Sequence, residues 1–416
     1  MFEWTEEHQM IEKMMRSFFA QELAPHVEDL EDEAMLPYPI MRKLLDTFGM
    51  TEAVRGGLLK KAEKLRQREA TGGVAVTDTE DWSGGAAQDP AMTALLAKEA
   101  GRISPGFFLS FGAQMGLCGL TLVSKGNAEQ LERFAIPVMT LEKVGAWGLT
   151  EPNSGSDAFS LQTVAEEKED HFLLNGSKTF ITNAPHADIM VVYAKVASAR
   201  ADKSRIYPFV VERGMKGLET GAPMKKMGMK GSPTGEIFMD DVIVPKTNLL
   251  GSLESSSREQ AKGILEGERS GAPAMCLGII ERCIEDVTRY SIERKQFGKP
   301  IADFQLIQAR IARMYVQYEN VRNLVFKQIW MQKENKGTMR AACAGKYYCT
   351  EAAVDVALEA VQLMGGNGYM REYAVERLMR DAELLRIGGG TSDIQLLNIA
   401  KDILLQEGHE ISLAGN

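Results

Sequence analysis

The segment GLTEPNSGSD, at residues 148–157, marks the point where the chain changes from a helical to a β composition. Its glycine, asparagine and serine residues permit tight turns and leave backbone N–H groups and hydroxyls exposed. Such a loop can hold an anion or line the edge of a flat, hydrogen-bonding cofactor. An ordinary connecting loop can have the same composition, so this segment alone leaves both interpretations open.

A second segment, NGSKTFITN at residues 175–183, predicts a turn that leads into a strand. Phe180 and Thr182 are two residues apart and therefore share a face of that strand. One side chain could stack on an aromatic ring while the other offers a hydroxyl. The alternative is a plain hairpin with Phe180 in the core.

The sequence on either side of these segments predicts three regions. Residues 1–140 have apolar residues at helical spacing, as do the long patterns of residues 253–416, whereas residues 141–252 have short runs of branched and aromatic residues. Strands and helices are thus segregated, which is typical of an α+β chain that is mainly helical. We place the domain boundaries at these limits.

Residues 57–90 differ from the rest of the first region. They begin with a charged helical stretch and continue with a segment rich in turn residues, which predicts an inserted helix and a surface loop. One interpretation is a solvated excursion of the chain, that is, a solvent-exposed insertion that takes no part in catalysis or binding. A lid or a partner-docking element is the other.

The net charge of the chain limits which kinds of molecule it is expected to bind. Lysine and arginine total 48 and aspartate and glutamate total 57 in a chain of 416 residues, so the formal net charge is −9. A nucleic-acid-binding protein usually has a basic face, which this balance disfavours. An anionic small ligand remains compatible, because a local site can be basic on an acidic protein.

Cysteine, histidine and apolar patterns exclude several other classes. The five cysteines form no CxxC pair, which favours reduced thiols, and the five histidines have no metal-ligand spacing, so we expect no metal. We identify no apolar run approaching about 18 residues, and hence predict no membrane span. The acidic start lacks a signal-peptide or transit-peptide pattern, which favours a cytoplasmic protein.

Several segments together resemble the acyl-CoA dehydrogenase family. Beyond the two segments quoted above, the resemblance rests on separate motifs in the family's order: Lys226–Ser232, Asp240–Pro245, Arg294–Gly298, Gln362–Tyr369, Arg380-Asp381 and Thr391-Ser392. It covers nearly the whole chain except residues 57–90.

The resemblance implies a fold and an activity. The fold has an N-terminal helical domain, a middle antiparallel β-barrel or sandwich domain and a C-terminal four-helix bundle. FAD lies between the last two domains, and a neighbouring subunit of a homotetramer, a dimer of dimers, contributes to its site. The implied reaction is α,β-dehydrogenation of an acyl-CoA thioester to a 2,3-enoyl-CoA, with an electron-transfer flavoprotein as acceptor.

The resemblance also implies sets of site residues. A loop set beside the flavin or its ribityl-phosphate arm is Trp147, Leu149, Thr150 and Ser156. A strand set beside the ring is Phe180 and Thr182. An interface set that reaches FAD across the dimer is Arg294, Gln296, Phe297, Gln362, Gly365 and Gly366. Thr391 and Asp393 complete the cofactor contacts, and the expected substrate contacts are Ser156, Arg269 and Gly390.

Arginine in the interface set suits a pyrophosphate, because its forked guanidinium matches phosphate oxygens. The alternative for Arg294 is a solvated charge on a helix.

The catalytic base departs from the common pattern of the family. Most members have a glutamate directly before Gly-Thr near the C-terminus, and this chain has Gly389 at that place. In the isovaleryl-type and long-chain-type branches, a glutamate immediately before an arginine on an earlier helix removes the α-proton. Glu268, followed by Arg269, matches that pattern. Glu266 is the rival, but it lies about 200° around a helix from Glu268.

A glycine at 389 is compatible with a base at 268. Two carboxylates on one α-carbon could not easily both ionise, because the pKa of one would rise sharply. The N–H of Gly389 and a flavin ribityl hydroxyl could hold the thioester oxygen. Arg269 is expected to orient its neighbours, since arginine keeps its proton.

Two other functions remain open at this point. One is a non-dehydrogenating flavoenzyme on the same fold, such as a desulfinase. The other is a flavin-bearing protein with little turnover. The position of the base hints at a branched, long or cyclic acyl chain only by analogy.

Overall fold

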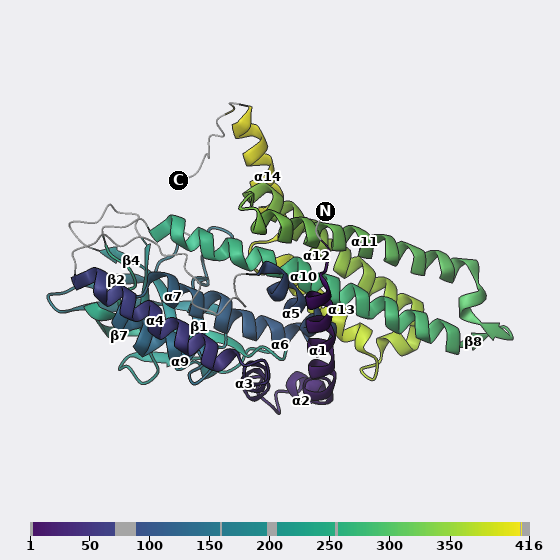
Figure 1. Cartoon of the computed structure of the whole chain (residues 1–416), viewed down its shortest axis with the longest axis horizontal. Helices are drawn as coiled ribbons and strands as arrows, with labels where there is room; N and C mark the ends of the chain where they lie inside the picture. Colours follow the sequence, from purple (N-terminus) through teal and green to yellow (C-terminus); the bar gives the residue numbers. More distant parts are fainter. Residues whose placement is uncertain are drawn as a thin grey trace.

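The computed structural model describes residues 3–70, 89–158, 160–197, 206–253, 257–407 and 409, with residues 257–270 described by their helical backbone alone. The chain forms helices, then a sheet, then long helices, and the N-terminal helices lie beside both later regions (Figure 1). The predicted three-part fold is confirmed. The domain boundaries themselves stay a proposal.

The N-terminal region consists of helices with two π-helical segments. They are α1 (Glu6–Glu22), α2 (Val27–Glu31), α3 (Tyr38–Thr47), α4 (Met50–Ala70), α5 (Pro90–Ile103), α6 (Pro105–Gly112), η2 (Ala113–Gly119), α7 (Leu120–Lys125), α8 (Ala128–Gln130), η3 (Leu131–Ala135) and α9 (Ile136–Met139). Thr5 is the N-cap of α1, where its side chain accepts a hydrogen bond from the backbone N–H of His8. This cap satisfies one of the free donors at the helix start.

Helix α4 contains the first part of the segment that the sequence sets apart. Leu58 and Ala62 are fully buried, in a cluster with Leu122, Leu131 and Phe134. This part of the segment is therefore a packed helix and not a solvated excursion. Residues 71–88 lie outside the described residues.

The prediction about long apolar segments needs a correction. The continuous segment Pro105–Lys125, which spans α6, η2 and α7, is long and apolar enough to cross a membrane by length and composition. The sequence prediction that no run approaches this length was wrong. The most apolar window of the segment is 61% buried inside the fold, as expected for a core helix, so its apolar composition is explained without a membrane.

The middle region is a seven-stranded curled sheet. Its strands are β1 (Gly145–Gly148), β2 (Val164–Glu167), β3 (His171–Thr182), β4 (Ile189–Ala197), β5 (Ile206–Glu212), β6 (Leu218–Thr220) and β7 (Thr234–Pro245), in the order β1-β4-β2-β3-β7-β6 with β5 on β4.

β1 and β2 lie end to end along one edge of β4, and both run parallel to it. β5 occupies the other edge of β4 in antiparallel register. The sheet is therefore mixed, which corrects the prediction of an antiparallel domain. The parallel pairings arise because residues 149–163 leave the edge of the sheet and return to it further along the same strand.

The C-terminal region is built from α10 (Ser257–Glu293), α11 (Gln305–Lys333), α12 (Met339–Met364), α13 (Ala374–Ile387) and α14 (Ser392–Gln406). The first four share one apolar core, which also includes alanines of α5. A short hairpin of β8 (Lys295–Gln296) and β9 (Lys299–Pro300) closes the far end of the bundle (Figure 1). All five cysteines are free and buried, as expected for reduced thiols.

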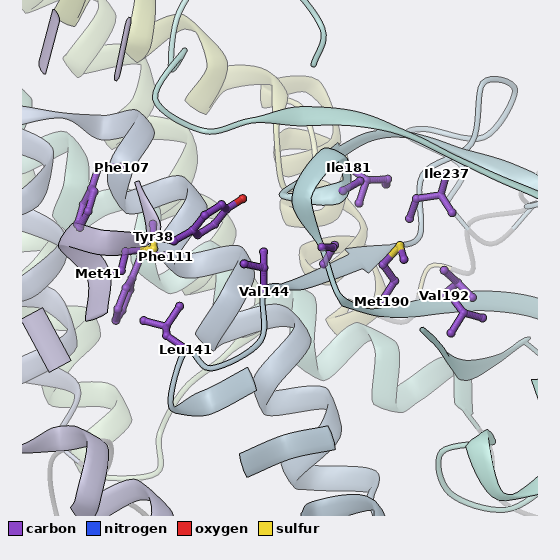
Figure 2. Close-up of a cluster of buried hydrophobic side chains, with 14 of the residues drawn as sticks. Tyr38, Met41, Phe107, Phe111, Leu141, Val144, Ile181, Met190, Val192 and Ile237 are labelled. Carbon is purple, nitrogen blue, oxygen red and sulfur yellow. The ribbon is translucent and has the colours of Figure 1, made fainter. Parts of the chain in front are cut away.

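A second apolar core joins the N-terminal helices to the sheet. Figure 2 shows side chains from both regions in this core: Tyr38, Met41, Phe107, Phe111, Leu141, Val144, Ile181, Met190, Val192 and Ile237. Burial of aromatic and aliphatic groups from both regions holds them together. The N-terminal helices thus share a core with each of the other two regions.

Helices α5 and α10 approach each other closely because small residues lie at their contact. A Cβ added to Gly278 would lie 2.1 Å from the carbonyl oxygen of Lys98. Lys98 also forms an ion pair with Glu281 at 2.8 Å, and Arg16 of α1 binds Glu281 at 3.1 Å. Charge pairing and close backbone contact together fix α10 against the N-terminal helices.

Replacing Gly278 by alanine should lower the free energy of unfolding by about 1–3 kcal/mol, because the added methyl group has no room. Denaturant titration measures the change. Gly56 in α4 is the control, since an added Cβ there would meet no described atom within 4 Å. Gly56→Ala should leave stability unchanged or raise it by up to about 1 kcal/mol. Equal effects of the two substitutions would contradict a close contact between α5 and α10.

Candidate functional site

A cavity of about 2070 Å³ lies where the three regions meet. It is lined by α6, η2 and α7, by the loop after β1, by the end of β3, by α10 and by the turn between α13 and α14. A site for one small ligand usually measures roughly 300–1,000 Å³. This cavity is at least twice as large.

The loop of residues 149–158 forms one wall, and a buried ion pair holds it. Glu151 accepts hydrogen bonds from the Nζ of Lys178 at 2.6 Å and from the backbone N–H of Thr163 at 3.0 Å. The hydroxyl of Thr163 and the N–H of Gln162 also donate to this carboxylate. The start of this loop and the residues just before β2 are thereby tied to β3.

The ion pair is charged at neutral pH. Burial raises the pKa of Glu151, but the hydrogen bonds from Gln162 and Lys178 outweigh it and lower this pKa overall. Burial lowers the pKa of Lys178 to about 8, which leaves its ammonium protonated at pH 7. A charged donor and acceptor give a stronger hydrogen bond than a neutral pair.

The loop set and the strand set both line the cavity. Trp147, Leu149, Thr150, Ser156, Phe180 and Thr182 all contribute to its wall. The indole N–H of Trp147 donates to the hydroxyl of Thr121 at 3.1 Å, which fixes the ring. The structure thus brings together the residues of two segments that are separated by more than twenty positions.

Phe180 lies outside the core, so the plain-hairpin alternative is excluded. Its side chain is 69% exposed, and its φ of 58° is left-handed. The pairing of β3 with β7 shifts register between Lys178 and Ile181. An aromatic residue in this backbone conformation is strained, and such strain is typical of functional sites. An exposed ring beside Thr182 gives the cavity a stacking surface and a hydroxyl.

The turn between α13 and α14 forms another part of the wall. Gly388, Gly389, Gly390 and Thr391 line the cavity. Gly389 and Gly390 have φ of 62° and 91°, which glycine adopts without steric cost. The hydroxyl of Thr391 caps α14 by accepting from the N–H of Ile394 at 3.3 Å.

Two hydrogen bonds connect the middle region to α13 beside the cavity. The N–H of Met229 donates to the buried carboxylate of Asp381, and the guanidinium of Arg380 donates to the carbonyl of Met227 at 2.8 Å. A Cβ on Gly228 would lie 2.4 Å from the Arg380 backbone. The two segments therefore fit together only with a glycine at 228.

The interface set lies apart from the cavity. Arg294, Gln296 and Phe297 are exposed at the end of the bundle, and Phe297 is 92% exposed. Gln362, Gly365 and Gly366 are exposed near the end of α12, and Asp393 at the start of α14 is exposed too; none of these seven lines the cavity.

The two parts of the interface set lie at the same end of the bundle. The amide of Asn367 donates to the hydroxyl of Tyr290 at 3.1 Å, which joins the segment after α12 to the end of α10. A role for this set at the cavity would require a second copy of the chain, and this role stays a prediction.

The proposed base is only partly described. Glu268 and Arg269 lie within α10, but their side chains are outside the described residues. Gly271, Ala272 and Met275 of the same helix line the cavity.

Sequence patterns missed several residues that build the site. Lys178, Glu151 and Asp381 lie in the quoted motifs without an assigned role, and Lys346 of α12 lies in none of them. Lys346 lines the cavity although it is buried. Its position within an alanine-rich helix gave no local signal.

Models of one protein family match most of the chain. The acyl-CoA dehydrogenase N-terminal domain matches residues 5–55 and 59–142, the middle domain residues 146–242 and the C-terminal domain residues 258–404.

Curated relatives cover nearly the full length. A probable acyl-CoA dehydrogenase of Bacillus subtilis is 35% identical over 97% of this chain and 99% of its own. The mitochondrial isovaleryl-CoA dehydrogenase of Arabidopsis thaliana is 34% identical over 94% and 90%. The caffeyl-CoA reductase–Etf complex subunit of Acetobacterium woodii is 33% identical over 96% and 99%.

Solved structures share the fold. The butyryl-CoA dehydrogenase of Megasphaera elsdenii has a TM-score of 0.82 at 33% identity and covers 97% of this chain and 100% of its own. An acyl-CoA dehydrogenase of Bacillus anthracis, solved with FAD, has a TM-score of 0.80 at 30% identity and covers 98% and 68%.

Lys178→Met should lower the free energy of unfolding by about 3–5 kcal/mol, because it leaves the Glu151 carboxylate buried without its counter-ion. The double variant Glu151→Gln, Lys178→Met should recover part of this loss. Lys168→Met is the control, since Lys168 pairs with Glu166 at the surface and should contribute less than about 1 kcal/mol. Additive effects at 151 and 178 in denaturant titrations would rule out the pair as an anchor.

The contribution of Asp381 to stability should depend on pH. Burial raises its pKa from 3.8 to about 6, so the folded state holds the proton more tightly than the unfolded state. The resulting stabilisation is complete below pH 3.8 and is lost as the pH rises through 6. Asp381→Asn does not titrate, so the stability of the wild type relative to this variant should increase by about 1 kcal/mol from pH 7 to pH 5. A constant or decreasing difference in unfolding experiments would contradict this assignment.

Proposed function

Because the chain belongs to the acyl-CoA dehydrogenase family, we propose that it oxidises a saturated acyl-CoA to the 2,3-enoyl-CoA. Members of this family are FAD enzymes. The supporting observation is the shared cavity, which is lined by the loop set, the strand set and a turn of glycines. A cavity of this size suits a cofactor and a CoA ester.

The residues of this cavity fit FAD. The exposed ring of Phe180 offers a surface for a flat ring system, with Trp147 and Leu149 beside it. Thr150, Ser156 and Thr182 offer hydroxyls to its polar edge. FAD held by these residues would supply an acceptor for the β-hydrogen of the substrate, which leaves as hydride.

Removal of the weakly acidic α-proton requires a carboxylate that faces the substrate. We assign this role to Glu268. Its position in α10 precedes the cavity-lining residues Gly271, Ala272 and Met275 by three, four and seven residues. Positions at this spacing lie on one face of a helix, which supports a base at 268. Glu266 is not on this stripe.

The site must also stabilise the charge that develops on the thioester oxygen. We assign the backbone N–H of Gly389 to this oxygen, since the glycine lines the same cavity as Phe180. Gly390 and Ser156 are proposed substrate contacts. A glycine at 389 leaves one carboxylate at the α-carbon, so the base can ionise without a like charge beside it.

The proposed function also includes an electron acceptor and an assembly. An electron-transfer flavoprotein is the acceptor we propose, and the relative from Acetobacterium woodii is named as a subunit of an Etf complex. A homotetramer would place the interface set of one chain at the cavity of another. Free, buried cysteines are compatible with a reducing compartment such as the cytoplasm.

Glu268→Gln should reduce dye-coupled dehydrogenation by at least about 10³-fold while FAD stays bound, because the amide cannot accept the α-proton. The assay uses butyryl-, isovaleryl- and palmitoyl-CoA, with anaerobic bleaching of the flavin as a second readout. Glu266→Gln is the matched control and should keep wild-type turnover.

Near-normal activity of Glu268→Gln would remove Glu268 from the mechanism. If none of the three thioesters bleaches the wild-type flavin, a non-dehydrogenating enzyme or a flavin-bearing protein with little turnover becomes the better assignment.

A further inference from the structure

Lys346 is a buried lysine that binds the glycine turn at the cavity. It lies in the middle of α12, and its side chain is only 3% exposed. Its Nζ donates hydrogen bonds to the carbonyl of Gly388 and, at 2.5 Å, to the carbonyl of Gly390. One ammonium thus holds the carbonyls on both sides of Gly389.

The turn depends on side chains for its shape. Residues 388–391 form neither helix nor strand, and Gly389 and Gly390 are both left-handed. The amide of the buried Gln395 donates to the carbonyl of Gly390 at 2.8 Å. Lys346 and Gln395 therefore fix a backbone conformation that local secondary structure does not impose.

The bond to Gly388 also fixes the direction of a donor. In a trans peptide, the carbonyl of one residue and the N–H of the next point in opposite directions. Because the Gly388 carbonyl points at Lys346, the N–H of Gly389 points away from Lys346. This N–H is the group assigned above to the thioester oxygen.

The charge of Lys346 adds to this effect. A buried ammonium beside the turn contributes positive potential where negative charge develops on the thioester oxygen. A neutral side chain of similar shape would supply neither the charge nor the paired donors.

We propose that Lys346 is a positioning residue for thioester activation: it orients the N–H of Gly389 toward the carbonyl oxygen of the bound acyl-CoA. The inference rests on the proposed dehydrogenase function. Lys346 acts through the turn and exchanges no proton with the substrate.

The test compares Lys346→Met with the wild-type FAD-loaded protein. We expect kcat to fall by about 10²-fold with a KM that changes only a few-fold, because a misplaced oxyanion donor affects the transition state more than binding. A second readout is the infrared carbonyl stretch of the bound 2-enoyl-CoA product of the best substrate. In the wild type this band should shift to lower frequency on binding, and in the variant the shift should be largely lost.

Lys98→Met is the matched control, because Lys98 is also buried and paired but does not line the cavity. It should lower stability while leaving the carbonyl shift of the bound product unchanged. If the carbonyl shift also changes in Lys98→Met, the change in Lys346→Met reflects a general loss of structure. That result would overturn the proposal.

Normal kcat and a normal carbonyl shift in Lys346→Met with FAD bound would also overturn it. If Lys346→Met loses FAD, the variant Lys346→Gln tests the proposal instead. The glutamine side chain is shorter than lysine but keeps one hydrogen-bond donor group. This variant should show a reduced kcat and a partial carbonyl shift, and wild-type values would contradict the proposal. Failure of every thioester to bleach the wild-type flavin would instead refute the proposed function, which separates the two results.

Discussion

The buried ion pair between Glu151 and Lys178 is the interaction on which the arrangement of the cavity depends. β1 and β2 lie on the same edge of β4, and the chain must leave that edge between them. Within this loop, backbone hydrogen bonds join Glu151 to Ser154, and side chains hold the two ends of the loop together. Glu151 gathers donors from Gln162, Thr163 and Lys178 around one carboxylate. This buried anion therefore anchors the wall that carries Thr150 and Ser156.

The other walls depend on contacts between regions. Asp381 and Arg380 hold the segment around Gly228 against α13, and Gly278 lets α10 lie close to α5. Each contact is tied to a residue that tolerates little change in size or charge. The site is therefore a property of how the three regions are joined, and no single region contains it.

Much of the fold could be predicted from the sequence because its signals are local. The helical spacing of the outer regions and the short strands of the middle one both depend on neighbouring residues. The parallel pairings of β1 and β2 with β4 could not be predicted from the sequence, since the paired residues are distant in sequence. The apolar segment Pro105–Lys125 was missed because η2 and its glycines break the run of large residues. Phe180 was ambiguous because only the register shift beside it determines which way the ring points. Lys346 has no local signal, because its partners are carbonyls about forty residues away.

The left-handed backbone at Gly389 has a consequence for how this site could have changed over time. A φ of 62° costs a residue with a side chain about 1–2 kcal/mol relative to glycine. Reintroducing glutamate there would strain a turn that Lys346 and Gln395 have already shaped around a glycine. Under the proposed assignment of the base, it would also set a second carboxylate beside that of Glu268. Each obstacle needs its own compensating substitution, so no single step leads back to the commoner placement of the base. The proposed placement of the base on α10 is therefore easier for further substitutions to keep than to exchange for a base at position 389.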